Sequence, residues 1–419
     1  TEVLSHLTFD AYILLQTKAF RMYSYGVLGV VLVLYLSELQ YTDREIGCIF
    51  TFTLFGDSIM SLLLTTHADK YGRRNCLLLG SCVAVITSLV FMTHSNYIVL
   101  VVAATLGVIS PSGNEVGPFN AIEISCLAQI TEKKFLTKIL AWYNLFGCFA
   151  CALGSLSSGF FVEVLQSNSF FQQGKLESYR TVLILYAFMQ VLMAFFFFCL
   201  GRKVELPPND LIFLKSEPRK VWFGLHSSRG IVITLSFLFA IDSFGGSFIM
   251  QTLISDWFYV VYDTRPSVLG TLLFFCNLFA GVSALFSATI ASHIGLVWTM
   301  VLTHLPSNIL TILVPLMPNE LLAIIILCSR FSISQMDVPA RNAYIQGVVQ
   351  PDERSAANGV TNIARSFGAV SGPLISGVLL QNWKTVNDPW FVAGGLKIVY
   401  DLLLLLNFHS VKSTADIYE

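Results

Sequence analysis

The chain has 419 residues, of which 55% are hydrophobic and only 12% are charged, and its mean hydropathy is +0.69. A soluble globular domain carries about twice that share of charge, so the composition excludes an ordinary soluble fold. The formal net charge of −1 gives no indication of a nucleic-acid partner.

Apolar runs follow one another along the chain, and each is long enough to cross a hydrocarbon core about 30 Å thick. We identify twelve, at roughly residues 20–38, 45–66, 75–94, 97–127, 137–163, 180–200, 230–254, 267–291, 295–316, 319–347, 355–381 and 389–408. Backbone polar groups cannot stay unpaired in lipid, so each run is predicted to be a helix. The first twenty residues carry Glu2, Asp10 and Lys18 and lack a compact apolar core, so no cleavable signal peptide is expected.

A short charged turn joins the second and third runs. It contains, in order, Asp69, Lys70, Gly72, Arg73 and Arg74. Two membrane helices joined by so short a turn form a tight antiparallel hairpin, and its basic residues are expected to face the cytoplasm. For the charges alone, an ordinary positive-inside turn is the alternative interpretation.

The distribution of Lys and Arg orients the predicted bundle. With the N-terminus in the cytoplasm, sixteen basic residues fall on the cytoplasmic side and five on the opposite side. This bias predicts a multi-pass membrane protein with both termini in the cytoplasm, and it does not identify the host membrane.

The fourth run is interrupted by Ser-Pro-Ser-Gly-Asn-Glu-Val-Gly-Pro-Phe. Pro111 and Pro118 each remove a helix hydrogen bond, and Asn114 and Glu115 lie between them. A broken membrane helix beside a carboxylate is a common way to build a substrate or proton site. The alternative is a kink that helps packing, with Glu115 paired to a basic residue. Glu123 lies eight residues further on, closer to the cytoplasm.

Ionisable groups inside a membrane are costly and often functional. Asp57 lies in the second run, and Asp242 lies in the middle of the seventh, with no basic residue near it in the sequence. Because a carboxylate in low dielectric holds its proton more tightly, Asp57, Glu115 and Asp242 are the predicted proton-coupling acids. Asp57 has local pairing as an alternative. Further hydrogen-bonding side chains predicted for the cavity, with core packing as the alternative, are Tyr143, Asn144 and Gln251.

The tenth run contains Arg330, Asp337 and Arg341, whose spacings of seven and four residues place them on one face of a continuous helix. Two Arg around one Asp leave an excess positive charge. That excess is suited to holding an anionic substrate or to pairing with Glu115 across a cavity, and pairing within the bundle is the alternative.

The last two runs contain charges for which we expect structural roles. Arg365 is expected to pair with Asp352 or Glu353 or to extend towards the cytoplasm. Lys397 and Asp401 are four residues apart and are expected to neutralise each other. Most of the nine Cys residues lie inside the predicted helices, which favours free thiols over a disulfide framework.

The two parts of the chain repeat each other with an offset of roughly 220 residues. Gly72 corresponds to Gly295, and residues 129–134 correspond to residues 349–354. The repeat predicts three regions: an N-terminal six-helix half at 1–200, a cytoplasmic central loop at 201–229 and a C-terminal six-helix half at 230–419.

The pattern Asp-Lys-x-Gly-Arg-Arg, in the turn between the second and third helices, resembles the corresponding motif of the major facilitator superfamily. With the duplicated halves, the resemblance covers nearly the whole chain. The nearest branch includes the drug/proton antiporters, but their Gly-Pro motif in helix five is absent here and appears instead at Gly372-Pro373. The fourth-run segment and Ser-Gln-Met-Asp-Val-Pro-Ala-Arg (334–341) resemble poorly characterised members of the family.

The resemblance implies an all-α membrane protein with twelve transmembrane helices in two pseudo-symmetric halves. It also implies a monomeric secondary active transporter of a small organic solute, with proton coupling and a gating motif in the charged turn. The partners would be the solute and the lipid bilayer, with no cofactor beyond a proton gradient. A non-transporting membrane sensor on the same fold is the alternative, whereas an enzyme is not expected because the common catalytic motifs are missing.

Overall fold

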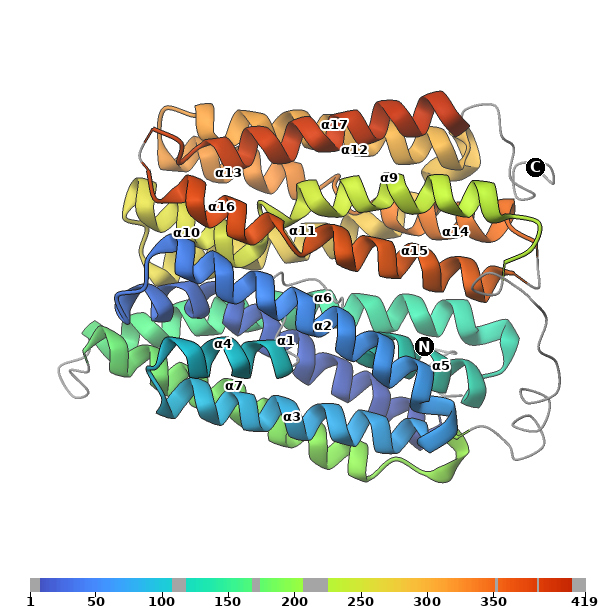
Figure 1. Cartoon of the computed structure of the whole chain (residues 1–419), viewed down its shortest axis with the longest axis horizontal. Coiled ribbons are helices and arrows are strands. Elements are labelled where there is room, and N and C mark those ends of the chain that lie inside the picture. The colour runs from blue at the N-terminus through green and yellow to red at the C-terminus, as the bar shows by residue number, and fades with distance from the viewer. Residues whose placement is uncertain are drawn as a thin grey trace.

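The structure is a computed structural model that describes residues 8–107, 118–167, 174–205, 225–350, 353–382 and 384–408. The first half of the bundle is built from α1 (Phe9–Glu38), α2 (Asp43–Tyr71), α3 (Arg73–Thr93), α4 (Tyr97–Leu106), α5 (Pro118–Ile130), α6 (Lys133–Ser167) and α7 (Lys175–Phe198). The second half is built from α9 (Arg229–Ser247), α10 (Gln251–Tyr262), α11 (Pro266–Ile294), α12 (Leu296–Leu313), α13 (Glu320–Phe331), α14 (Asp337–Val348), α15 (Arg354–Ala369), α16 (Gly372–Leu380) and α17 (Asp388–Phe408). Figure 1 shows the two halves side by side.

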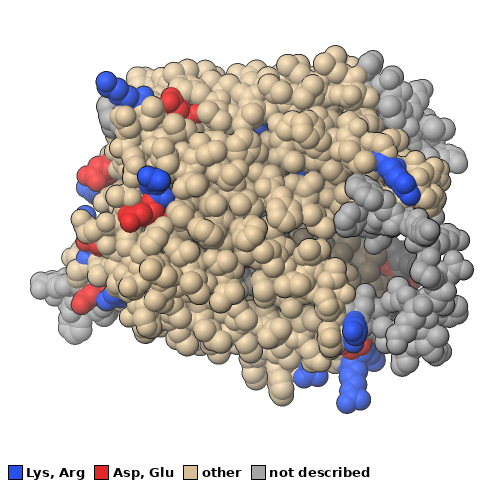
Figure 2. All heavy atoms as spheres, in the orientation of Figure 1, with Lys and Arg blue, Asp and Glu red and all other residues tan. Residues whose placement is uncertain are grey.

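These helices form twelve membrane spans, six in each half. Four spans consist of two helices each, namely α4 with α5, α9 with α10, α13 with α14, and α15 with α16. Ten helical segments are long and apolar enough to cross a membrane, and two of the shorter ones, in the fourth span, are also apolar. Figure 2 shows Lys, Arg, Asp and Glu side chains gathered at the two ends of the bundle and a surface almost free of them in between. The chain is therefore an integral multi-pass membrane protein.

The tenth span is not the continuous helix that the sequence predicted. α13 ends at Phe331 and α14 begins at Asp337. Pro339 lies in the first turn of α14, where its missing N–H costs little, whereas in the middle of one long helix it would remove a hydrogen bond. Arg330 therefore lies on a different helix from Asp337 and Arg341, and the seven-residue spacing does not place it on their face.

The two ends of the bundle are distinguished by their turns. We call the end that carries the α2–α3 turn, the α11–α12 turn and the described termini Thr8 and Phe408 the basic end, and the opposite end the far end. The start of α1 and the end of α17 lie at the basic end, on the right of Figure 1. Gly72 and Gly295, with φ of 98° and 82°, form equivalent turns in the two halves, as the repeat predicts.

The apolar cores show which end of the bundle is closed. One core joins the halves towards the far end and includes Leu36 of α1, Trp257 of α10 and Trp390 of α17. Towards the basic end each half has its own core, one around Leu127 and the other around Tyr344. Figure 2 shows a recess between the halves at the basic end. The bundle is therefore sealed at the far end and parted at the basic end.

Two close helix crossings seal the far end. A Cβ atom built on Gly159 of α6 would lie 3.0 Å from the Cα of Gly270 on α11, and one on Gly377 of α16 would lie 3.1 Å from the Cα of Gly47 on α2. Small residues allow helix backbones to approach this closely. The crossings involve pseudo-equivalent helices, so the same contact is made twice around the seal.

Candidate functional site

Asp242 lies at the centre of a buried charged network in the C-terminal half. Its Oδ1 is 2.6 Å from Nζ of Lys397 and 3.7 Å from Nε2 of His304, and its Oδ2 is 3.4 Å from Nη1 of Arg341. All four side chains are buried. The expectation that Asp242 has no neutralising neighbour is wrong, because the cations come from α12, α14 and α17, which are remote in sequence.

Asp401 joins this network through His304. The Nδ1 atom of His304 is 2.8 Å from Oδ1 of Asp401, and Asn308 donates to Oδ2 of the same carboxylate at 2.8 Å. The expected pairing of Lys397 with Asp401 is not formed, since each residue bonds to another helix. His304 and Asn308 were missed in the sequence, although two polar residues four apart in an apolar run are a signal for such a site.

Arg341 joins two carboxylates. Its Nη1 lies 3.4 Å from Oδ2 of Asp337, one helical turn away on α14, and at the same distance from Asp242. Its guanidinium also lies 5.4 Å from the ring centroid of Phe239. The structure thus supports the alternative in which Arg341 is paired within the bundle.

Arg330 and Arg365 lie beside this network without joining it. Both are within electrostatic range of Asp242 and Asp337. Neither forms a salt bridge or hydrogen bond with a described residue, and the Nε atom of each is buried without a partner. The expected pairing of Arg365 with Glu353 is wrong, because Glu353 accepts hydrogen bonds from the backbone amides of residues 226–228 instead.

A second buried cluster lies in the N-terminal half around Glu123. Arg21 donates to both carboxylate oxygens at 2.9 and 2.6 Å, Thr17 donates to Oε1 at 2.8 Å, and Tyr143 donates to Oε2. Arg21 and Glu123 are 1% and 0% exposed. Because α1 begins at Phe9, Arg21 lies inside the bundle, whereas the sequence interpretation counted it among the cytoplasmic residues.

The other predicted site residues are scattered. Asp57 on α2 is 1% exposed, and neither of its carboxylate oxygens has a hydrogen-bond partner among the described residues. Asn144 is exposed on α6, one residue beyond Tyr143. Asn114 and Glu115 lie outside the described residues, so their predicted roles stay predictions.

Gln251 is paired at the break between α9 and α10. It donates to Oδ1 of Asn277 on α11 at 2.7 Å, and its own Oε1 faces Gly29 of α1. Ser255, one turn further along α10, donates to the Gly29 carbonyl at 2.8 Å. These buried amides lie where the two halves meet.

The charged turn of the predicted gating motif is bound to its own half. Glu205, which follows the short 3₁₀ helix η2 (Arg202–Val204), accepts the backbone N–H groups of Arg73 and Arg74 at 2.7 and 3.0 Å. Arg73 also donates to the carbonyls of Ser125 and Val204. The Arg74 side chain donates to the Phe198 carbonyl at 2.5 Å. Lys70 lies over Tyr71, and the side chain of Asp69 is outside the described part of the chain.

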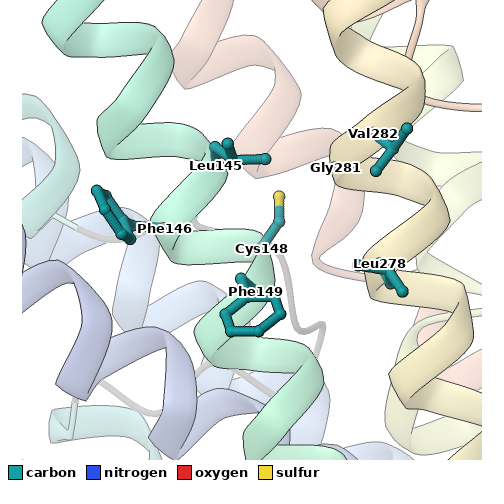
Figure 3. A pocket seen from close by; sticks show the side chains of 7 residues that line it. All are labelled: Leu145, Phe146, Cys148, Phe149, Leu278, Gly281 and Val282. Carbon is teal, nitrogen blue, oxygen red and sulfur yellow. The ribbon is translucent and has the colours of Figure 1, made fainter. Parts of the chain in front are cut away.

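A small apolar pocket of about 180 Å³ lies between α6 and α11 (Figure 3). Its walls are formed by Leu145, Phe146, Cys148, Phe149, Leu278, Gly281 and Val282. Ligand sites usually have about 300 to 1,000 Å³ and several polar groups, so this pocket is not the candidate site. In the described ranges no group of three or more His, Cys, Asp or Glu residues is arranged to hold a metal ion.

Comparisons with known proteins agree with this architecture. Residues 17–373 match the Major Facilitator Superfamily. The chain is 31% identical to the uncharacterized membrane protein YJR124C of Saccharomyces cerevisiae, over 96% of this chain and 94% of that protein.

Solved structures share the fold at low sequence identity. The nucleoside transporter NupG matches 97% of this chain and 100% of its own at 14% identity, with a TM-score of 0.71. A D-xylose-proton symporter matches 97% of this chain and 98% of its own at 12% identity, with a TM-score of 0.72. A bacterial homolog of the human lysosomal transporter Spinster, in an inward-facing and occupied conformation, matches 94% of each chain at 14% identity, with a TM-score of 0.66.

Proposed function

Because the chain belongs to the major facilitator superfamily, a family of membrane transporters, we propose that it is a secondary active transporter that moves a small organic anion by alternating access. The observation that carries the proposal is the pair Arg330 and Arg365, two guanidinium groups without a salt bridge to any described residue, beside a buried charged network. An Arg grips a carboxylate or phosphate by two parallel hydrogen bonds.

The basic end faces the cytoplasm in this proposal. Lys and Arg are enriched in cytoplasmic loops, and when the termini are placed there the basic end still receives many more such residues than the far end after Arg21 is left out of the count. The seal at the far end and the recess at the basic end then correspond to an inward-facing state. In the opposite state, the glycine crossings would separate and the charged turn with Asp69 and Arg73 would latch the basic end.

The balance of charge favours an anion. Around Asp242 the described carboxylates are those of Asp242, Asp337 and Asp401, and the permanent cations are Lys397, Arg330, Arg341 and Arg365. The cations exceed the acids by one even when His304 is neutral. Arg330 and Arg365 are half-buried, so neither side chain is fully enclosed by its neighbours. The anion-binding role that the sequence assigned to Arg341 passes to Arg365 in this proposal, because Arg341 already binds two carboxylates.

Proton coupling is the energy source we propose, with Asp57 as the acid in the N-terminal half. A buried, unpaired carboxylate is far more stable with its proton bound, and it releases that proton only when the conformation exposes it. Asp242 has less support than Asp57, since two permanent cations, Lys397 and Arg341, lie against its carboxylate and favour its ionised form.

The test is transport by purified protein in proteoliposomes. The panel would contain lactate, succinate, citrate and inorganic phosphate, with D-xylose and uridine as neutral solutes, each with and without a pH gradient. We expect accumulation of at least one anion that depends on the gradient. Arg365→Lys keeps the charge but loses the planar fork, so anion affinity should fall roughly ten- to a hundred-fold. Arg44→Lys, an exposed change at the far end, is the matched control.

The Gln251 and Asn277 amides favour a second candidate, a neutral hydroxylated solute. Relatives of this fold include a D-xylose-proton symporter and a nucleoside transporter. Uptake of D-xylose or uridine without uptake of any anion would replace the first proposal with this one. Binding of a solute without flux would instead indicate a non-transporting sensor.

A further inference from the structure

The C-terminal network contains a titratable group that bridges two carboxylates, and that group is His304. Its Nδ1 faces Asp401 at 2.8 Å and its Nε2 faces Asp242 at 3.7 Å. A neutral imidazole carries one N–H, so in either tautomer one nitrogen lone pair would point at a carboxylate. Only the protonated ring presents an N–H to both acids.

The amide of Asn308 does not change this assignment. Its nitrogen lies 3.1 Å from Nδ1 of His304, but it also donates to Oδ2 of Asp401 at 2.8 Å. The amide therefore has a carboxylate acceptor of its own and does not need the imidazole lone pair. Together, Asn308 and His304 give each oxygen of Asp401 one donor.

The charges in direct contact are balanced only when His304 carries a proton. The contacting acids are Asp242, Asp337 and Asp401, and the contacting permanent cations are Lys397 and Arg341. With a neutral imidazole this contacting set carries one negative charge in excess, and with an imidazolium it carries none; Arg330 and Arg365, which contact none of these acids directly, are outside this count. A buried unbalanced charge is costly, so the proton occupancy of His304 is tied to the state of the whole set.

Other groups face His304 from every neighbouring helix and act on the same equilibrium. Tyr400 of α17 meets the imidazole edge-on at a ring-centroid distance of 5.7 Å. Asp242 and Asp401, which contact the ring, favour a positive charge on it, while Lys397 and Arg341, which bind Asp242, oppose that charge. Asp337, Arg330 and Arg365 act from further out, through their neighbours Arg341 and Asp242. Loss of a proton therefore weakens contacts to two helices at once, α9 and α17.

We propose that His304 takes up the coupled proton in the C-terminal half and that this proton and the anion bind cooperatively. The inference rests on the proposed transport function. Protonation adds a positive charge to the network that Arg330 and Arg365 flank through Asp242, so the anion binds more tightly, and by linkage a bound anion favours the protonated ring. His304 also contacts Asp242 of α9. The same span continues as α10, whose Ser255 bonds to Gly29 of the other half, so this span links the network to the contact between the halves.

The test measures anion binding against pH. Equilibrium binding of the panel anions to detergent-purified protein should strengthen between about pH 8 and about pH 6, roughly 5- to 150-fold, the usual range for coupling between two sites. His304→Gln should lose this dependence, and His304→Lys should show pH-independent binding. The control His293→Gln changes an exposed His at the α11–α12 turn and should keep the wild-type profile. An unchanged pH profile in His304→Gln would overturn the proposal.

A second measurement needs neither an anion nor a His304 variant. The chain has seven His residues, and replacing the other six by Gln leaves His304 as the single imidazole for ¹⁵N NMR. We expect its nitrogens to change from neutral to charged between about pH 9 and about pH 5. A ring that keeps one charge state throughout would overturn the proposal. If His304 titrates but no anion binds, the proposed substrate class fails and the proton site stands.

Discussion

The two halves bury charge at equivalent places with opposite sign. In the N-terminal half Arg21 of α1 pairs with Glu123 of α5, and in the C-terminal half Asp242 of α9 pairs with Arg341 of α14. Arg21 and Asp242 are separated by the repeat offset of roughly 220 residues, and Glu123 and Arg341 by nearly the same number. The duplicated fold thus places a charged pair between the same two spans in each half.

The two clusters differ in how completely their acids are bonded. Both oxygens of Glu123 are occupied by Arg21, Thr17 and Tyr143, so the loss of any partner leaves a buried group unsatisfied. In the other half, Asp242 has three cationic neighbours, one of them the titratable His304. The first cluster is suited to holding helices together, and the second is suited to changing its charge state without coming apart.

The largest expected effect is in the N-terminal cluster. Arg21→Gln leaves Glu123 buried without its cation and should lower the free energy of unfolding by about 3–5 kcal/mol. Thermal unfolding of detergent-purified protein measures this. The double variant Arg21→Gln with Glu123→Gln should recover much of the loss, because no charge is left unpaired. Equal stability of the single and double variants would contradict a tightly paired cluster.

The corresponding change in the C-terminal network should cost less. Lys397→Gln leaves Asp242 with Arg341 and His304, so the expected loss is about 1–2 kcal/mol in the same unfolding assay. The control is Lys384→Gln, a change of an exposed lysine four residues before α17 begins. If Lys397→Gln lowered the free energy of unfolding as much as Arg21→Gln does, the two clusters would be equally intolerant of losing a cation. The difference proposed between the two halves would then be wrong.

The two glycine crossings are equivalent contacts between the halves, so a bulky substitution at either crossing should destabilise the sealed far end to a similar extent. Gly159→Val and Gly377→Val each place side-chain atoms against the backbone of the facing helix, which costs about 1–3 kcal/mol in the sealed state. Spin labels at Tyr71 and His293, exposed near the two basic-end turns, should move closer together in both variants. A shift in only one variant would mean that the two crossings do not share the seal.

The smallest effect is expected at the basic end, where Glu205 and Glu353 accept backbone amides in the two halves. Burial would raise the pKa of Glu353, but hydrogen bonds from Ser228 and the backbone of residues 226–228 outweigh it and lower the pKa from 4.5 to about 2. The ionised carboxylate therefore stabilises the fold above pH 4.5, and this contribution is lost as the pH falls towards 2. Glu353→Gln should lower Tm slightly at neutral pH and flatten the Tm–pH curve in that window. A variant curve parallel to the wild-type curve would exclude this role.

Local features were predictable from the sequence because they depend on nearby residues alone. The length and apolar character of the runs give the membrane spans, since unpaired backbone groups are excluded from lipid. Gly72 and Gly295 occupy turns with positive φ that other residues rarely adopt, so the equivalence of the two hairpins could be seen in advance. The prolines at 118, 339 and 373 lie in the first turns of α5, α14 and α16, where the missing N–H costs little.

The partners of the buried charges were decided only by the tertiary structure. Lys397 and Asp401 have the spacing of a helical ion pair, yet they do not pair with each other. Lys397 bonds to Asp242 and Asp401 bonds to His304, both on other helices. Arg21 lies at the very start of the first predicted run, but α1 begins at Phe9, well before that run, and carries Arg21 into the bundle. A charge in low dielectric binds the nearest opposite charge in space, and which helices meet is set by packing across the whole chain. The sequence alone therefore determines which residues are ionisable within the membrane, and the fold determines which of them are neutralised and which have no ion pair with a described residue.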